Sequence, residues 1–154
     1  MSDYYVDSSV LVKRHVRESG TDWFTAVADP ATGNTILTAL VSMVEVISAL
    51  QRRVREGVLD AGDAARLSSD FQALCVTEYR VIALTTPVIE RACQLLVRHP
   101  LRAYDAVQLA AALIARDALV TAGAAAMTFL SADRRLLNAA AAEGLLLTDP
   151  STFP

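Results

Sequence analysis

The sequence predicts an α/β fold in which helices cover both faces of a central, mostly parallel sheet. Short runs rich in β-branched and aromatic residues alternate with longer segments of helical periodicity along the whole chain. The length of 154 residues is typical of one domain, and no repeat, linker or low-complexity segment divides it. We therefore expect a single domain over residues 1–154, with a parallel sheet buried on both sides.

The first third of the chain should contain two strands and two short helices. Residues 4–6 form an apolar run followed at once by helix-capping residue types, which is typical of a buried strand that enters a turn. Residues 10–16 have helical character, Gly20 interrupts it, and residues 21–28 can form a second short helix. Residues 35–38 are the second expected strand.

The middle of the chain should hold two longer helices and the third strand. Apolar side chains recur at helical spacing over residues 42–56, and Gly57 supplies a stop. Residues 60–79 are also amphipathic, and residues 81–84 form the third strand. The apolar face of the second of these helices consists of Leu67, Phe71 and Leu74.

The last third should contain three helices and two strands. Thr86 caps Pro87, which suits the first helical position, and this helix should run to about Arg98. Residues 103–115 are the most apolar helical segment. Residues 127–130 and 145–147 are strand-like, and residues 133–143 between them are helical.

Composition limits the classes of protein that this chain can belong to. A content of 53% hydrophobic and 20% charged residues excludes a disordered chain. Cys75 and Cys93 form no metal-ligand cluster, which predicts reduced thiols and no zinc site. The start of the chain lacks a signal-peptide pattern, and Arg116 and Asp117 end the most apolar helix before it can span a bilayer. We therefore expect a cytoplasmic protein without membrane contact.

The net charge of −3 argues at first against a nucleic-acid partner. If four of the acids surround cations in one cleft, however, the rest of the chain sums to about +1. All but one of the 14 basic residues are arginine, whose guanidinium matches phosphate with two parallel donors. The composition permits a nucleic-acid substrate, although a biased genome explains the arginine content equally well.

Two acids follow expected strands and should lie at the same edge of the sheet. Asp7 comes directly after residues 4–6, and Asp133 follows residues 127–130 with Ser131 between them. Ligands bind beyond the carboxyl ends of the strands in open α/β sheets, so both acids are candidate site residues. Either acid alone is explained as well by capping of the helix that follows it.

Two further acids lie in the first turns of expected helices. Glu45 points away from the apolar face of its helix, which is typical of a site residue, of a solvated residue, or of a capping box with Ser42. Asp105 lies beside the apolar side of residues 103–115 and therefore needs a partner, for which a cation and Arg116 are both candidates.

The four acids together suggest a hard divalent cation. Four carboxylates that meet in one place would repel each other strongly without a cation between them. Mg²⁺ and Mn²⁺ prefer oxygen ligands, and the two histidines are too few and too poorly placed to suggest a softer metal.

Four segments of the chain carry a resemblance to a known family. They are Tyr5-Val6-Asp7-Ser8-Ser9-Val10-Leu11-Val12-Lys13, Ser42-x-x-Glu45, Tyr104-Asp105-Ala106-x-Gln108-Leu109-Ala110-Ala111-Ala112 and Phe129-Leu130-Ser131-Ala132-Asp133-Arg134-Arg135-Leu136. In this order and with these gaps they resemble the PIN-domain ribonucleases, most closely the VapC toxins of bacterial and archaeal toxin–antitoxin pairs. The likeness runs over nearly the whole chain.

The resemblance implies a three-layer α/β/α PIN-like fold and assigns roles to the acids. Asp7 and Asp105 would hold the principal Mg²⁺ or Mn²⁺, and Glu45 and Asp133 would complete the site or bind a second ion. The hydroxyl groups that orient these carboxylates would belong to Ser9 and Ser131. The helix over residues 57–79 varies among family members and bears on the choice of partner.

The implied activity is a metal-dependent endoribonuclease, the toxin of a type II toxin–antitoxin pair. Its expected partners are RNA, a cognate antitoxin and a second copy of the chain. The apolar faces around Phe71, Leu74 and the Ile47 helix exceed what a small monomer must cover, which fits either protein partner. Arg134 and Arg135 are the basic residues nearest to the expected metal and are candidate RNA contacts, although a solvated helix face explains them as well.

The sequence bears on three other functions. An aspartyl phosphatase would need a second acid two residues after Asp7, where this chain has Ser9. A phosphate-binding loop needs a glycine-rich turn, which the six glycines do not form. A non-catalytic interaction module of the same fold, with its acids used for capping, stays open as the alternative.

Overall fold

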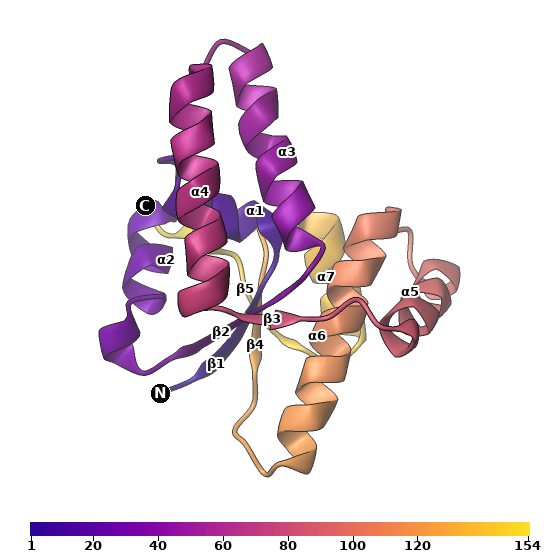
Figure 1. Ribbon diagram of the computed structural model, residues 1–154. Coiled ribbons are helices and arrows are strands. Elements are labelled where there is room, and N and C mark those ends of the chain that lie inside the picture. The colour runs from indigo at the N-terminus through magenta and orange to yellow at the C-terminus, as the bar shows by residue number, and fades with distance from the viewer.

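A five-stranded, wholly parallel sheet forms the centre of the computed structural model, which describes residues 1–154 (Figure 1). The strands are β1 (Asp3–Val6), β2 (Thr35–Ala39), β3 (Arg80–Ile82), β4 (Thr128–Leu130) and β5 (Leu146–Thr148). Their spatial order is β3-β2-β1-β4-β5, so the chain begins in the centre and builds outward in both directions. The α/β class with a parallel sheet is confirmed.

Seven α-helices connect the strands. They are α1 (Ser8–Leu11), α2 (Thr21–Val27), α3 (Ser42–Arg55), α4 (Ala61–Thr77), α5 (Thr86–Arg98), α6 (Ala103–Thr121) and α7 (Arg134–Ala142). Three 3₁₀ turns at Val12–Arg14, Pro30–Thr32 and Pro150–Thr152 complete the regular structure. No helix combines the length and apolar character that a membrane span requires.

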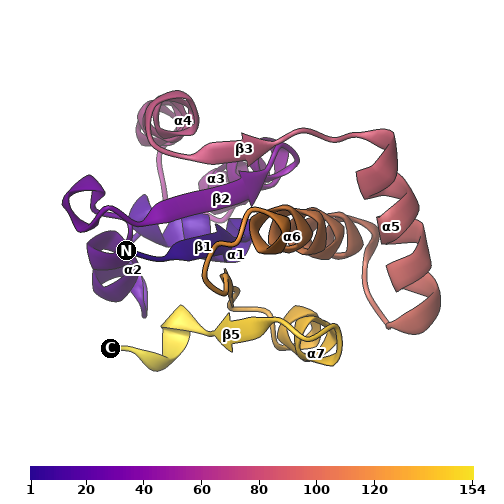
Figure 2. The same ribbon diagram turned by 90° about the horizontal axis from the view of Figure 1, so that it is seen from below.

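The sheet separates two apolar cores, because neighbouring residues of a strand point to opposite faces. Tyr5 of β1 and Phe129 of β4 stack with ring centroids 5.5 Å apart, in the core that α5, α6 and α7 cover. Val6 and Leu130, the next residues along, belong to the other core, beneath α1 to α4. Figure 2 shows these two helical layers on either side of the sheet, which gives the three-layer α/β/α architecture.

Two helices differ in extent from the sequence prediction. The first is a single α-helical turn that continues as a 3₁₀ turn, not one helix over residues 10–16. The helix expected over residues 103–115 continues to Thr121. Arg116 and Asp117 do not end this helix as predicted. Arg116 bonds to Asp117 and to the Glu143 carbonyl, so its charge stays at the surface while the helix continues.

The apolar face expected to receive a partner is already covered within the chain. Helices α3 and α4 pair as a hairpin that rises from the body (Figure 1). Phe71 is fully buried between them in the same core as Leu50, and its ring packs edge-on against His15. Leu74 is half-buried against this core. These side chains hold the hairpin together and are not a free docking surface, which corrects the sequence-based expectation.

Candidate active site at the carboxyl edge of the sheet

Asp7 lies at the centre of the candidate site, where β1 ends. It is 3% exposed and caps α1, since its Oδ1 accepts a hydrogen bond from the Val10 amide at 3.3 Å. The Ser9 hydroxyl donates to the same oxygen at 2.6 Å, and the Ser131 hydroxyl donates to Oδ2 at 2.7 Å. Both serines singled out in the sequence therefore contact Asp7 directly.

The environment of Asp7 disfavours its negative charge. The pKa of this carboxyl is raised from 3.8 to about 7, chiefly by burial and to a smaller extent by the nearby charge of Glu45. The hydrogen bonds from Ser9, Ser131 and Val10 act in the opposite direction but do not cancel the burial. No lysine or arginine forms an ion pair with Asp7. At neutral pH the site therefore gains from a proton or a metal cation at this carboxyl.

The two serines also tie Asp7 to the segment that carries Asp133. The Asp133 amide donates to the Ser131 hydroxyl at 3.0 Å, and the Ala132 amide donates to the Ser9 hydroxyl at 3.0 Å. The ends of β1 and β4 are thus joined through two hydroxyl groups. Asp133 caps α7 through Oδ1 alone. Both Asp7 and Asp133 therefore cap helices, as the sequence allowed, and both keep carboxylate lone pairs that could bind a cation.

Glu45 does not form the capping box that the sequence allowed. The residue before α3 is Val41, and no side chain caps this helix. The Gln108 amide instead donates through Nε2 to Glu45 Oε1 and to the Ser42 hydroxyl, at 2.8 Å in each case. The Tyr5 hydroxyl donates to Gln108 Oε1 at 2.7 Å. Glu45 is therefore held at the sheet edge by a buried polar network that reaches into the core.

Asp105 lies in the first turn of α6 and is half-buried. Burial raises the pKa of its carboxyl, and the negative charge of Asp133 adds to this. The positive charge of Arg102 opposes the shift. Arg116, considered in the sequence as a partner of Asp105, bonds to other groups and does not contact it.

Three of the four acids line two adjoining clefts, whereas Asp7 is buried and lines neither. Glu45 lines the larger cleft, of about 520 Å³, while Asp105 and Asp133 line the smaller, of about 210 Å³. Arg102 lines both. Burial raises the pKa of Glu45 most, and the negative charge of Asp105 raises it as well. The charge of Glu45 raises the pKa of Asp7 in the same way, and the charge of Asp133 raises that of Asp105. Each acid is therefore within electrostatic reach of the next.

The residues present fit a hard divalent cation by donor type and charge. Their oxygen atoms are the ligands that Mg²⁺ and Mn²⁺ prefer, and the carboxylates of Asp7, Glu45 and Asp105 each carry a pKa raised by burial that a cation would lower. As the side chains stand, no three acidic, histidine or cysteine side chains lie close enough to hold one ion. The donor atoms therefore suit the cation, but the acidic side chains must move closer together to bind it.

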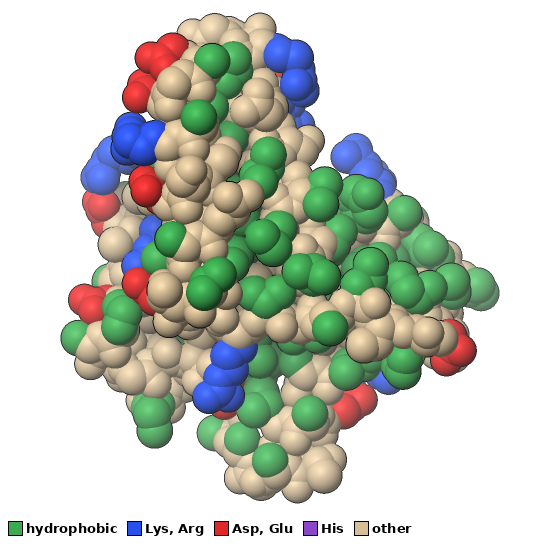
Figure 3. Space-filling view, viewed as in Figure 1, with side chains coloured by type: hydrophobic (Ala, Val, Ile, Leu, Met, Phe, Trp, Pro, Cys, Tyr) green, Lys and Arg blue, Asp and Glu red, His purple; other side chains and the backbone are tan.

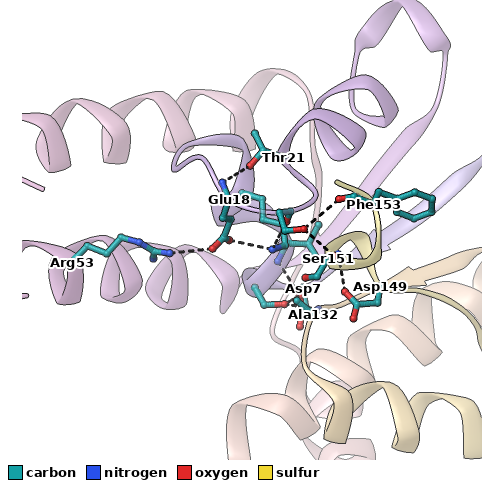
Figure 4. Close-up of polar contacts among 12 residues, drawn as sticks. Asp7, Glu18, Thr21, Arg53, Ala132, Asp149, Ser151 and Phe153 are labelled. Carbon is teal, nitrogen blue, oxygen red and sulfur yellow. Dashed lines mark hydrogen bonds and ion pairs between the residues drawn. The ribbon is translucent and has the colours of Figure 1, made fainter. Parts of the chain in front are cut away.

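The basic residues near the site differ in their surroundings. Lys13 is buried and donates to the Ser19 carbonyl at 2.9 Å and to Glu18 at 3.3 Å, so it does not belong to a solvated helix face. Figure 4 shows Glu18 reaching toward Arg53 as well, at 3.4 Å. Arg134 and Arg135 are exposed and line the smaller cleft beside the acids.

Sequence reasoning missed the part that Gln108 plays in the site. Gln108 entered the sequence analysis only as part of a motif, yet its side chain is only 1% exposed. An amide inside a run of alanine and leucine residues is a signal in itself, because a buried amide needs several hydrogen-bond partners.

Comparison with known proteins identifies the family. The PIN domain matches residues 4–142 of this chain. A search of curated proteins by sequence finds no match. The fold is similar to PAE2754 from Pyrobaculum aerophilum, with a TM-score of 0.64 and 18% identity over 98% of this chain and 85% of that one.

Two further solved structures have the same fold. VapC20 of Mycobacterium tuberculosis, a toxin that cleaves the sarcin–ricin loop, has a TM-score of 0.63 and 18% identity over 98% of this chain and 99% of its own. A toxin–antitoxin complex from Klebsiella pneumoniae has a TM-score of 0.62 and 15% identity over 96% of this chain and 97% of the matched one. With the PIN domain spanning most of its length, the chain belongs to the PIN domain family.

Proposed function

We propose that this PIN domain is a metal-dependent endoribonuclease and the toxin of a type II toxin–antitoxin pair. The observation that carries the proposal is the buried Asp7 carboxyl, which has two hydroxyl donors, no basic partner and an electrostatic link through Glu45 to the remaining acids. Such a carboxyl is costly for a fold unless a cation or a proton compensates it. The structural similarity to VapC20, which cleaves RNA, agrees with the proposal.

The resemblance to the PIN-domain ribonucleases implies different roles for the four acids. Asp7 and Asp105 would hold the principal Mg²⁺ or Mn²⁺, and Glu45 and Asp133 would complete the site. When bound, such an ion neutralises phosphate charge and lowers the pKa of water, which makes hydrolysis of a phosphodiester feasible. Ser9 and Ser131 fix the orientation of the Asp7 carboxylate through its two oxygens.

The other side chains of the site prepare it for an anionic substrate. Gln108 holds Glu45 at the edge of the larger cleft, ready to accept a proton from water or to bind the cation. Arg134 and Arg135 lie at the start of α7 and can receive the phosphates beside the scissile bond. We expect hydrolysis to leave a 5′-phosphate and a 3′-hydroxyl.

The proposed partners are a cognate antitoxin and a second copy of the chain, within the cytoplasm. Since the α3–α4 face is covered, another apolar surface must serve them. Figure 3 shows apolar side chains gathered around α5 and the connection that leads to it. The exposed apolar residues of this region include Leu84, Ile89, Leu96 and Val97. Their exposure suits a protein partner.

The experiment that tests the activity is cleavage of RNA with mapped ends. Purified protein with Mn²⁺ should cut RNA internally and leave 5′-phosphates, and Asp7→Asn should not. The alternative, a non-catalytic module of the same fold, predicts no cleavage and no Mn²⁺ binding. Full activity in excess EDTA would exclude a metal-dependent reaction.

A further inference from the structure

The arginines without an acidic partner are concentrated at the two clefts. Seven of the arginines form ion pairs on the surface, namely Arg14, Arg17, Arg53, Arg66, Arg91, Arg98 and Arg116. Of the unpaired ones, Arg52 lines the larger cleft, Arg134 and Arg135 line the smaller, and Arg102 lines both. Only Arg55 and Arg80 are unpaired elsewhere. Guanidinium groups without a carboxylate are available to phosphate groups.

Within the larger cleft, the cations divide into fixed and free ones. Lys13 and Arg53 are both held by Glu18, at 3.3 Å and 3.4 Å, and their charges are partly neutralised. Arg52 and Arg102 have no such partner and lie on the same cleft as Glu45. Arg52 follows Glu45 by two helical turns, about 10 Å along α3, so the free positive charge extends well beyond the acids.

The same cleft has an exposed aromatic ring. Tyr104 is 54% exposed, comes directly before Asp105 and has no hydrogen-bond partner for its hydroxyl within the chain. Tyr5 and Tyr79, in contrast, are buried, and Tyr4 is half-buried. Val44, also exposed, lines the cleft with Tyr104 and adds apolar surface. An exposed ring beside unpaired arginines is the combination that binds single-stranded nucleic acids through base stacking and phosphate contacts.

We infer that Tyr104 is a base-stacking residue for the RNA substrate, and that Arg102 and Arg52 bind the phosphates on either side of the stacked base. This inference rests on the proposed ribonuclease function and assigns substrate contacts to three residues outside the four acids. Bases in a duplex are stacked and paired inside the helix and cannot reach Tyr104, so this contact forms only with an unpaired base.

A fluorescent RNA tests the inference without any cleavage. A single-stranded RNA of about ten nucleotides, with 2-aminopurine in the middle, is mixed with the full-length protein in EDTA. Stacking on Tyr104 quenches the emission of 2-aminopurine, and anisotropy of an end label reports binding separately. Tyr104→Leu should abolish the quenching and weaken binding by about tenfold, whereas Tyr104→Phe should keep both. The exposure of Tyr104 means that the melting temperature should not change.

The arginines are tested by salt dependence. Arg102→Ala and Arg52→Ala should each weaken binding and reduce the slope of log K against log salt by about 0.7, the value for one phosphate on a single strand. Arg55→Ala is the matched control, since Arg55 is an unpaired arginine at the end of α3 that lines neither cleft. It should leave the slope unchanged.

The outcomes separate this inference from the proposed function. Quenching that persists in Tyr104→Leu, or a duplex that binds as tightly as the single strand, overturns the inference. Failure of metal-dependent cleavage, with quenching intact in the wild type and lost in Tyr104→Leu, instead refutes the ribonuclease and leaves an RNA-binding cleft. A wild type that cleaves RNA but gives no quenching removes the stacking on Tyr104 alone.

Discussion

Gln108 holds Glu45 through a hydrogen bond of 2.8 Å from its buried amide Nε2 to Glu45 Oε1. The direction of this amide is fixed by its surroundings, because the Tyr5 hydroxyl donates to Oε1 on the other side. Gln108 on α6 thereby determines the position of Glu45 on α3, which belongs to the other helical layer. This coupling makes Gln108 a positioning residue for the site.

Replacement of Gln108 by leucine should impair metal binding more than it impairs the fold. The variant leaves Glu45 without its donor, and the loss of such a supporting partner typically weakens metal affinity by about 10- to 100-fold. It also leaves the Tyr5 hydroxyl without an acceptor, at a stability cost of about 1–3 kcal/mol. Calorimetric titration with Mn²⁺ measures the affinity, and urea unfolding in EDTA measures the stability.

Tyr5→Phe is the control for this variant. It leaves Gln108 Oε1 unsatisfied and should lower the stability of the protein to a similar degree, yet it keeps the bond from Gln108 to Glu45. Its Mn²⁺ affinity should therefore stay within about threefold of the wild type. Equal affinities for Gln108→Leu and the wild type would show that Gln108 serves the fold only.

The buried Asp7 carboxyl should make the protein less stable as the pH rises. Its pKa in the folded state is raised from 3.8 to about 7, so the folded protein binds the proton more tightly than the unfolded chain does. The corresponding stability is fully present below about pH 4 and is lost as the pH rises through about 7, by at most about 4 kcal/mol. Urea unfolding in EDTA between about pH 4 and 8 measures this change.

Asp7→Asn should remove this component of the pH dependence. The amide cannot ionise, so the variant should be more stable than the wild type at about pH 8 and similar to it near pH 4. Its RNA cleavage should fall by about a hundredfold or more, since a ligand of the proposed metal is lost. A variant that is less stable than the wild type at about pH 8 would contradict the conclusion that burial disfavours the charged form of Asp7.

Ser131 should influence metal binding through the charge of Asp7. Ser131→Ala removes a donor to Asp7 Oδ2, and since this hydrogen bond lowers the pKa of Asp7, the pKa should rise further. Mn²⁺ would then compete with a more tightly bound proton, so the affinity should fall more at about pH 7 than at about pH 8.5. Titrations at both pH values measure the difference.

The threonine variant is the matched control for this prediction. Ser131→Thr keeps the hydroxyl that donates to Asp7 and that accepts from the Asp133 amide. It should therefore retain the Mn²⁺ affinity of the wild type at both pH values. A loss of affinity in Ser131→Ala that is the same at both pH values would place the effect on geometry and not on the proton.

The strands and the placement of Asp7, Ser9, Ser131 and Asp133 could be predicted from the sequence because they depend on neighbouring residues. A short run of apolar residues followed by a capping residue determines both a strand and the polar group at its end. The periodic pattern of residues 42–56 likewise predicts the helix α3. These features are local, and the structure agrees with the predicted order of elements.

The features that were not predicted depend on partners far away in the chain. The side chain of Glu45 turns to Gln108, which is 63 residues later, and a capping box within the helix has the same sequence pattern. Lys13 is buried because the Ser19 carbonyl and Glu18 meet it, and nothing in a run of basic residues distinguishes it from its neighbours. Phe71 lies against α3, although its spacing is equally typical of an exposed apolar stripe.

Divalent cations should stabilise the protein, and Asp105 should be required for the effect. At a Mn²⁺ concentration about a hundred times the dissociation constant, binding to the folded state adds about 2.7 kcal/mol, which corresponds to about 5–10 °C in melting temperature. Asp105→Asn removes a proposed ligand and should abolish this shift. Asp117→Asn, an exposed acid on the same helix that lines neither cleft, should keep it. Melting curves with Mn²⁺ and with EDTA for the three proteins measure the effect, and a shift in Asp105→Asn equal to that of the wild type would place the cation elsewhere.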